Sequence, residues 1–600
     1  MREYATPLTL TLPLGENLAD DIVRHATETP DRVVISRRAG DEWTDVTAAE
    51  FHRTVRSVAG GLISSGIAPG DRIALMARTR YEWTVLDYAI WYAGAVTVPV
   101  YETSSLEQAQ WILQDSGAVA AIGETSAHLD RLREAVASAA GSATCRQIWG
   151  IDDDCVGTLM AAGEEIPAGE VDARRGAVGG TDTATLIYTS GTTGRPKGCE
   201  LSHDNFLFEA SVAIAELREL FDSETDASTL LFLPLAHVFA RVIQVGSIRA
   251  GVRLGHSSDI RHLLDDLARF QPTFLLAVPR IFEKIFNTAS QRAVADGRGR
   301  LFQRSVEAAI DWSRSLDGGR ASVSHRLRRA TYDRLVYARM RQALGGRCVY
   351  AVSGGAPLGE RLAHFYRGLG VNILEGYGLT ETTAALTVNS PRAQKVGTVG
   401  RPLPGTSVRV ADDGELLFKG GQIFTGYWKN AAATAEAVDA QGWFHSGDIG
   451  EVDDEGFVRI TGRKKEILVT AGGKNVAPAV LEDRIRAHWL VDQCMVVGDG
   501  QPFVAALVTI DPDALGTWRD THDKSAPLAS LTNDRDLRAD IQDAIDDANR
   551  AVSRAESVRK FVIIPTSWTE ESGELTASLK LKRNVVMTQC SDQIEALYTR

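Results

Sequence analysis

The chain has 600 residues, more than one hydrophobic core usually supports, so we expect at least two domains. With 44% hydrophobic and 24% charged residues, its composition is that of an ordinary globular protein. Its formal net charge of -13 disfavours nucleic acid as a main partner, because phosphate backbones require a basic surface.

The cysteines and the N-terminal sequence indicate in which cellular compartment the protein is expected. The six cysteines show no Cys-x-x-Cys spacing, so no zinc site or disulfide framework is expected. The first residues lack the basic and then apolar layout of a secretion signal. Both observations favour the cytoplasm, where thiols stay reduced.

The first half of the chain alternates helical and β-rich patterns. A helical pattern at 47–65 precedes β-rich runs at 72–76 and 95–100, and a similar run lies at 274–278. This alternation predicts α/β layers around largely parallel sheets. The longest apolar stretch, 88–101, is shorter than the roughly 20 residues that span a bilayer, so no membrane-spanning segment is expected.

A loop at 188–198 is the most informative local feature, and it reads Tyr-Thr-Ser-Gly-Thr-Thr-Gly-Arg-Pro-Lys-Gly. Its glycines let backbone N–H groups turn toward an anion, its hydroxyls add donors, and Lys197 supplies a positive charge. The glycine spacing and the proline before the lysine differ from a Walker A loop. A surface turn is the plainer interpretation, but so long a run favours phosphate binding.

Between residues 281 and 347 the pattern changes to long, arginine-rich helices, which predicts a helical insertion. In the simpler interpretation the arginines form a solvated face, paired with acidic residues such as Glu307, Asp311 and Asp333. In the alternative interpretation they draw the protein toward anionic lipid at the inner face of a membrane.

Glycines become frequent over 398–461, where short strands alternate with turns and predict a β-rich subdomain. A small α+β domain with its own alternation of elements is expected beyond it. The predicted division is a large domain at 1–462 and a small domain at 463–600. The predicted fold class is therefore α/β, with two α/β layers and the β-rich subdomain in the large N-terminal domain.

The loop at 188–198 matches the AMP-binding signature of the acyl-adenylate-forming enzymes, which include acyl-CoA synthetases, luciferases and peptide-synthetase adenylation domains. Further motifs of that family follow in the expected order. They lie at 231–237, 353–358, 375–382, 443–448, 462–466, 471–478 and 573–580. Because they are collinear over most of the chain, the sequence resembles this family. The helical insertion is similar to that of its bacterial-type long-chain fatty acyl-CoA synthetases.

The resemblance implies a site for ATP and Mg²⁺. Tyr377 would lie against the adenine, Asp448 would accept hydrogen bonds from the ribose, and Arg463 would reach the ribose or the phosphates. Thr189 and Glu381 would hold Mg²⁺ through oxygen atoms. The other residues implied to bind the nucleotide are Ser190, Gly191, Thr192, Thr193, Gly194, Lys197, Gly354, Gly355, Ala356, Glu375, Gly376, Gly378 and Thr380.

Catalytic groups are also implied by the resemblance. Lys580 would bridge the substrate carboxylate and the α-phosphate during adenylation. Leucine replaces glycine in the family's Gly-Lys-x-x-Arg pattern, which leaves Lys582 as an alternative. His237 would lie beside the substrate carboxylate, or it has a purely structural role.

A second half-reaction with CoA would require the catalytic lysine to leave. The resemblance implies that the small domain is mobile and rotates about Lys465, which withdraws Lys580. The rotation would present Gly472 and Gly473 to the pantetheine arm of CoA, since glycines admit a narrow chain close to the backbone. The same glycines would also make an ordinary hairpin turn.

The substrate is inferred from the segment after the Pro-x-x-His motif. Amino-acid-activating relatives carry an aspartate there, whereas this chain reads Phe-Ala-Arg-Val at 239–242. Phe239, Val242, Val245 and Val352 are candidate walls of an apolar acyl tunnel. The prediction is a long-chain fatty acid–CoA ligase acting through acyl-AMP. The alternatives are a fatty acyl-AMP ligase that supplies a carrier protein and an inactive nucleotide-binding scaffold.

Overall fold

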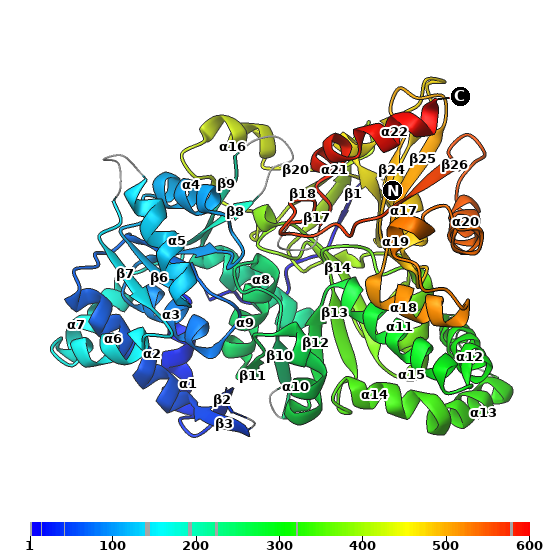
Figure 1. Cartoon of the computed structure of the whole chain (residues 1–600). Helices are drawn as coiled ribbons and strands as arrows, with labels where there is room; N and C mark the ends of the chain where they lie inside the picture. The colour runs from blue at the N-terminus through cyan, green and yellow to red at the C-terminus, as the bar shows by residue number, and fades with distance from the viewer. Residues whose placement is uncertain are drawn as a thin grey trace.

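The computed structural model describes residues 3–13, 15–40, 42–138, 144–189, 195–222, 226–317, 319, 322–576 and 580–599. In this part of the chain the strands form five sheets, two of them large and mainly parallel. This arrangement confirms the predicted α/β class with two α/β layers (Figure 1). Helices pack on the large sheets, as parallel strands require helical crossovers.

The first large sheet has seven strands; in the order given next, the last five are mutually parallel, and the first two pair in the antiparallel sense. In sheet order they are β19 (Gly426–Tyr427), β9 (Lys197–Ser202), β8 (Thr183–Thr189), β5 (Val96–Val100), β4 (Arg72–Met76), β6 (Ala120–Gly123) and β7 (Gln147–Gly150). The helices of this region are α2 (Ala48–Ser64), α3 (Tyr81–Tyr92), α4 (Leu106–Ser116), α5 (Ser126–Ala137), α6 (Cys155–Gly163) and α7 (Ala168–Gly176). A capping box between Thr47 and Glu50 starts α2 where the sequence predicted a helix.

The second large sheet has nine strands and antiparallel pairs at both edges. In order they are β16 (Arg401–Pro402), β15 (Thr387–Val388), β14 (Asn372–Tyr377), β13 (Tyr350–Ser353), β12 (Phe274–Ala277), β10 (Ser228–Leu231), β11 (Arg253–His256), β2 (Val33–Ala39) and β3 (Glu42–Thr47). Its associated helices are α1 (Asp20–Glu28), α8 (His203–Glu216), α9 (Val238–Ala250), η2 (Ile260–His262), α10 (Leu263–Phe270) and α15 (Glu360–Leu369).

A buried polar network joins the two layers. Arg241 of α9 is fully buried and pairs with Asp87 of α3 at 2.6 Å. Its guanidinium also donates to Thr185 of β8 at 2.7 Å. Removing one partner of such a pair costs about 3–5 kcal/mol, because the other charge is left buried. The pair therefore fixes α9 against α3, across the junction of the two layers.

The range of the predicted helical insertion, a name we keep for it, contains α11 (Pro279–Ala295), α12 (Gly299–Asp317), α13 (Val323–Tyr332), the π-helical turn η3 (Asp333–Tyr337) and α14 (Ala338–Ala343). Helix α12 packs against α15 at Gly368, where a Cβ atom would lie 2.1 Å from the carbonyl oxygen of Ala309. Only glycine allows the two helices to approach this closely.

The predicted β-rich subdomain is an antiparallel sheet. Its strands are β1 (Glu3–Ala5), β17 (Ser407–Val410), β18 (Glu415–Lys419), β20 (Phe444–Val452) and β21 (Val458–Arg463), and the short helices η4 (Thr380–Thr382) and α16 (Ala431–Ala437) lie nearby in sequence. The sequence did not predict β1, which pairs with β17 from the other end of the domain. A three-residue strand carries too little periodicity to be recognised locally.

The C-terminal region has its own hydrophobic cores around a three-stranded sheet. The sheet consists of β24 (Val491–Val497), β25 (Val504–Ile510) and β26 (Val558–Ile564), and a separate pair is formed by β22 (Leu468–Val469) and β23 (Asn475–Val476). The helices of the region are η5 (Lys464–Glu466), α17 (Pro478–Arg486), α18 (Pro512–Thr521), α19 (Leu528–Leu531), α20 (Arg535–Asn549), α21 (Arg583–Gln589) and α22 (Ser591–Tyr598). In Figure 1 these orange to red elements lie above the green helical insertion.

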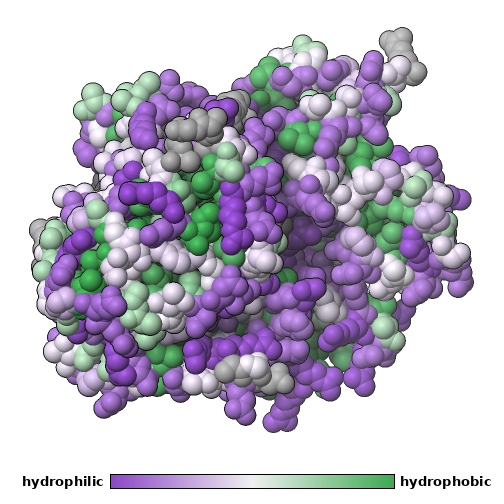
Figure 2. Space-filling view, turned by 60° about the vertical axis from the view of Figure 1, so that its left-hand side comes forward, coloured by the Kyte–Doolittle hydropathy of each residue, from purple (hydrophilic) through white to green (hydrophobic). Residues whose placement is uncertain are grey.

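The face of the molecule drawn in Figure 2 is mainly hydrophilic, with hydrophobic residues scattered over it. None of the helices in the described ranges combines the length and hydrophobicity that a membrane crossing requires.

Candidate functional site

A cleft of about 1600 Å³ is lined by residues of the large domain, the β-rich sheet and the C-terminal region. Most of the predicted site residues line it. They are Thr189, Lys197, His237, Gly354, Gly355, Gly376, Tyr377, Gly378, Thr380, Glu381, Asp448, Arg463, Lys465 and Lys580. Ala356, Glu375, Gly472 and Gly473 do not line it. Ser190, Gly191, Thr192, Thr193 and Gly194 lie outside the described residues.

Tyr377, Asp448 and Arg463 form one contiguous group. The Tyr377 hydroxyl donates to Asp448 Oδ2 at 2.5 Å, and Arg463 Nε lies 3.1 Å from Asp448 Oδ1. Strand register explains the second contact, because Asp448 of β20 is paired directly with Arg463 of β21. Burial raises the pKa of Tyr377 well above its ordinary value, and Asp448 adds to this shift, so the phenol stays a donor. Each carboxylate oxygen keeps a lone pair that can accept from a ribose hydroxyl.

Glycines shape the backbone beside this group. A Cβ atom at Gly378 would lie 1.4 Å from the carbonyl oxygen of Ala384, and one at Gly354 would lie 3.1 Å from the Phe239 ring. Side chains are therefore excluded next to Tyr377. The resulting bare backbone surface can accommodate a flat aromatic base such as adenine.

A second group of cleft residues, around Glu381, carries atoms suited to phosphate and metal chemistry. Glu381 Oε1 accepts from the Tyr427 hydroxyl at 2.8 Å, and Lys197 Nζ lies 4.9 Å from the centroid of the same ring. Thr189 and Lys197 are paired across the β8–β9 hairpin, and Thr189 Oγ1 is 4.0 Å from Cys199 Sγ. Glu381 is a second neighbour of Cys199, since after burial it contributes most to raising the pKa of that thiol.

The donor set suits magnesium, which prefers oxygen ligands and retains several waters. One carboxylate and one hydroxyl, Glu381 and Thr189, border the same spot. Among the residues that the structure describes, no cluster of three histidine, cysteine, aspartate or glutamate side chains could hold a metal. Two oxygen ligands leave coordination positions that substrate phosphates and water can fill.

The sequence did not single out Tyr427. It reaches Glu381 because β19 pairs with β9, a strand far earlier in the chain. Its local sequence contains no signal of this contact beyond an aromatic residue after a glycine.

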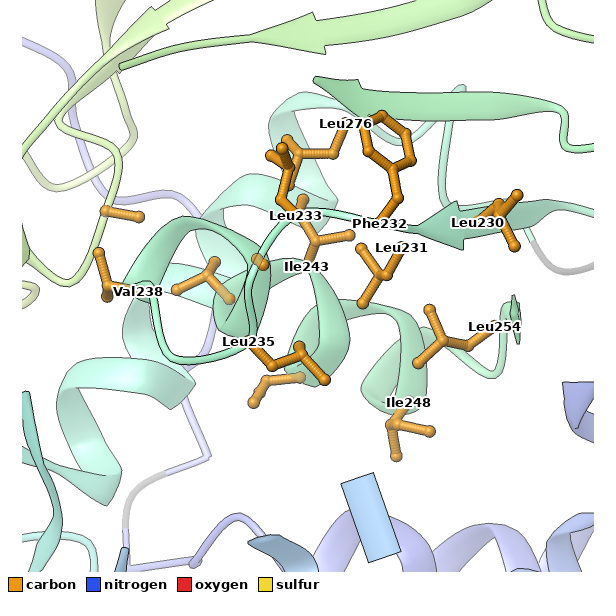
Figure 3. Packing of buried hydrophobic residues seen from close by; sticks show 14 of the residues in the cluster. Leu230, Leu231, Phe232, Leu233, Leu235, Val238, Ile243, Ile248, Leu254 and Leu276 are labelled. Carbon is orange, nitrogen blue, oxygen red and sulfur yellow. The ribbon is translucent and has the colours of Figure 1, made fainter. Parts of the chain in front are cut away.

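His237 caps α9 and also lines the cleft. Its Nδ1 accepts the Phe239 backbone N–H at 3.2 Å, and the leucines of β10 that precede it belong to the buried cluster in Figure 3. Burial, with a smaller contribution from Lys580, lowers the pKa of His237 to about 3. The imidazole is therefore neutral, and with Nδ1 accepting, its proton lies on Nε2 as a donor. The structural and functional interpretations are compatible.

Both candidate lysines of the C-terminal region line the cleft. Lys580 is exposed inside it, yet the surrounding protein lowers the pKa of its ammonium, and Arg463 lowers it further. Asp448 and Glu381 act in the opposite direction, so Lys580 lies within electrostatic reach of three predicted site residues. Its backbone N–H donates to Thr576 Oγ1 at 3.0 Å.

The Lys580 loop is held from its C-terminal side by Arg583. The Arg583 guanidinium forms an ion pair of 2.6 Å with Glu482 of α17, and it also donates to the carbonyl of Val496 at 2.5 Å. Further contacts link the C-terminal region to the large domain, namely Arg280 with Asp492 and Thr103 with Glu570.

The region around Lys465 connects the β-rich sheet to the C-terminal region. Lys465 lies in the short helix η5, and its neighbour Lys464 pairs with Asp413 at 2.5 Å and Glu415 at 3.0 Å. Gly472 and Gly473 are exposed in the turn between β22 and β23. In this arrangement Lys580, and not the glycine turn, faces the cleft.

Part of the cleft is lined by apolar side chains, and we call this part the apolar branch. Phe239, Val242 and Val352 line it as predicted, and Val238, Ile243, Ala213, Leu217, Val388 and Leu403 add to it. The prediction for Val245 was wrong, because this side chain is fully buried in the core and does not line the cleft. It lies almost one turn beyond Val242 on α9, where the helix is packed in the hydrophobic core.

Comparisons with known proteins identify the family of the chain. A profile of the AMP-binding enzyme family matches residues 22–428, and one of the AMP-binding enzyme C-terminal domain matches residues 465–600. The chain is 49% identical over 602 residues to long-chain-fatty-acid–CoA ligase FadD15 of Mycobacterium tuberculosis, covering 100% of both chains.

The chain is also similar to more distant proteins in sequence and in fold. Long-chain-fatty-acid–CoA ligase ACSBG2 of Xenopus laevis is 27% identical over 95% of this chain and 82% of its own. The A-PCP didomain of carboxylic acid reductase from Segniliparus rugosus, solved with AMP, has a TM-score of 0.74 at 21% identity and covers 98% of this chain and 83% of its own. The chain belongs to the AMP-binding enzyme family.

Proposed function

We propose that the protein is a long-chain fatty acid–CoA ligase that activates its substrate as an acyl-AMP. The observation that carries the proposal is the convergence of Lys580, Glu381 and Asp448 on a cleft with an apolar branch. The full-length identity to mycobacterial FadD15 supports the long-chain fatty acid and CoA as substrates. An inactive scaffold would have no need for this combination of charged groups.

In the first half-reaction, ATP would bind with its adenine against the backbone of Gly354 and Gly355 and its ribose on Asp448. The fatty acid would place its methylenes in the apolar branch, where each buried methylene contributes about 0.8 kcal/mol. The Nε2–H of His237 would orient the carboxylate. One carboxylate oxygen then attacks the α-phosphorus, and the bond to pyrophosphate breaks.

Electrostatic stabilisation would provide most of the rate enhancement, because negative charge crowds the α-phosphate during the attack. The Lys580 ammonium would bridge the two reacting groups, and Arg463 and Lys197 would neutralise neighbouring oxygens. Thr189 and Glu381 would hold magnesium, which when bound neutralises charge on the phosphates. Tyr427 would fix the Glu381 carboxylate through its hydrogen bond.

In the second half-reaction, the CoA thiolate attacks the acyl carbonyl and AMP leaves. Lys580 occupies the cleft in the arrangement described above, so we propose that the C-terminal region rotates about Lys465 before CoA binds. This rotation would break the contacts of Arg280 with Asp492 and of Thr103 with Glu570. It would bring Gly472 and Gly473 to the path of the pantetheine arm.

We also infer that the helical insertion associates with anionic membrane surfaces from one side of the bilayer. Helix α13 exposes Val323 and Leu327, at 72% and 66%, beside the exposed Arg326 and Arg328. Apolar side chains flanked by arginines favour insertion at the headgroup boundary. More of the protein should co-sediment with anionic vesicles than with neutral ones, and the Leu327→Ser variant should co-sediment less with anionic vesicles. The inference would be contradicted if the unmodified protein sedimented equally with both kinds of vesicle and the variant sedimented as the unmodified protein does.

The test of the catalytic proposal is an assay with ATP, magnesium, CoA and fatty acids of graded length. Pyrophosphate and acyl-CoA are measured separately. Both products should rise with long-chain acids. Pyrophosphate without acyl-CoA would indicate a carrier protein as acceptor, and no product with any acid would refute the proposal.

A further inference from the structure

A buried glutamate interrupts the apolar branch of the cleft. Glu209 lies on α8 with no exposed surface, and it lines the cleft together with Ala213 and Leu217. Glu209 and Ala213 are four apart and share one face of α8, and Leu217 follows at the C-cap of the helix. The surrounding sequence, Phe-Leu-Phe-Glu-Ala-Ser-Val at 206–212, is otherwise almost entirely apolar.

Only one oxygen of this carboxyl group is satisfied. Glu209 Oε1 accepts the Ala385 backbone N–H at 3.1 Å. Oε2 is buried and has no hydrogen-bond partner within the described ranges of the chain. A buried polar atom left in this state typically costs about 1–3 kcal/mol, so its presence requires a physical reason. A leucine at this position would line a tunnel for plain alkyl chains at no such cost.

The protonation state of the Glu209 carboxyl group suits its apolar surroundings. Burial raises the pKa of Glu209 well above its ordinary value, while the Ala385 N–H partly opposes this. The carboxyl group is then neutral and compatible with an apolar wall, and its second oxygen can both donate and accept. A ligand group that both donates and accepts is its best complement.

We propose that Glu209 is a specificity-determining residue that selects fatty acids carrying a hydroxyl group at the point where the chain passes it. The proposal rests on the ligase function above and adds a substrate class to it. A methylene at this point leaves Oε2 unsatisfied, whereas a hydroxyl forms a hydrogen bond with it. Sites that hydrogen-bond a substrate hydroxyl discriminate against analogues without it more strongly than apolar pockets discriminate by size.

The experiment compares saturated acids of one chain length whose single hydroxyl is moved along the chain, with the unsubstituted acid as reference. The readout is kcat/KM for pyrophosphate release. We expect kcat/KM to be about tenfold higher for one hydroxyl position, or for two adjacent ones, than for the other isomers. This factor corresponds to the free energy of roughly one hydrogen bond. A profile without such a maximum in the unmodified protein would overturn the proposal.

Three variants link the maximum to Glu209. Glu209→Leu should remove the maximum while turnover of the unsubstituted acid is kept or increased. Glu209→Gln, whose amide also donates and accepts, should retain most of it. Glu216→Leu, on the same helix but away from the cleft, is the matched control and should leave the profile unchanged.

The outcomes separate this inference from the proposed function. A maximum that persists in Glu209→Leu would overturn the inference even if the enzyme is an active ligase. Absence of pyrophosphate release with every acid, including the unsubstituted one, would instead refute the ligase function. Thermal unfolding of each variant shows whether it has folded. If Glu209→Leu has not folded, the dependence of kcat/KM on hydroxyl position in the unmodified protein tests the inference.

Discussion

Replacement of Lys580 by alanine should separate the two half-reactions. The Lys580 ammonium lies within electrostatic reach of Asp448, Glu381 and Arg463, and it also acts on the imidazole of His237. Removing one well-placed stabiliser of transition-state charge typically reduces kcat by about 10²- to 10³-fold, or about 3–4 kcal/mol. Arg463 and Lys197 remain in the variant, so a loss of this size is expected in place of complete inactivation.

The assay measures each half-reaction by itself. ATP–pyrophosphate exchange in the presence of a long-chain acid reports adenylation, and conversion of supplied acyl-AMP and CoA to acyl-CoA reports thioester formation. Lys580→Ala should impair the first by the amount given above and leave the second within about twofold. Lys582→Ala is the matched control, since Lys582 also lines the cleft.

Two results would refute this reasoning. Equal losses in both half-reactions of Lys580→Ala would mean that the lysine does not leave the site between them. A larger loss of adenylation in Lys582→Ala than in Lys580→Ala would assign the catalytic role to the other lysine.

Three further substitutions test other parts of the site. Glu381→Ala should raise the magnesium concentration needed for half-maximal adenylation, because a carboxylate ligand is lost, and an unchanged magnesium dependence would remove Glu381 as a ligand. Gly378→Ala should raise the KM for ATP at least tenfold and lower the melting temperature, because its Cβ would lie 1.4 Å from the Ala384 carbonyl oxygen; unchanged values of both would contradict the packing described here. Burial raises the pKa of Glu375 from 4.5 to about 7, so the folded protein holds this proton more tightly than the unfolded chain. Its contribution to stability should therefore fall as the pH rises from about 4.5 to about 7 and then level off, and Glu375→Gln should lack this part of the pH dependence in urea unfolding; identical pH profiles would refute it.

Regular elements were predicted well where the local pattern was strong. The run at 72–76 is strand β4 with the same bounds, and the helical pattern at 47–65 became α2. Strand β1 was missed because three residues show no periodicity, and its partner β17 is at the far end of the domain. Val245 was misassigned because two valines three apart on α9 cannot be told apart from sequence, although only Val242 lines the cleft.

By itself, the sequence determined the α/β class and the order of the family motifs, and with them the chemical types required for adenylation: hydroxyls, glycines, carboxylates and a lysine. Only the tertiary structure decided which of these groups meet. The contact of Tyr377 with Asp448, that of Tyr427 with Glu381, and the position of Glu209 on the wall of the apolar branch all join segments far apart in the chain. Such contacts depend on sheet register and on the packing of helices between the sheets, and no local pattern encodes either.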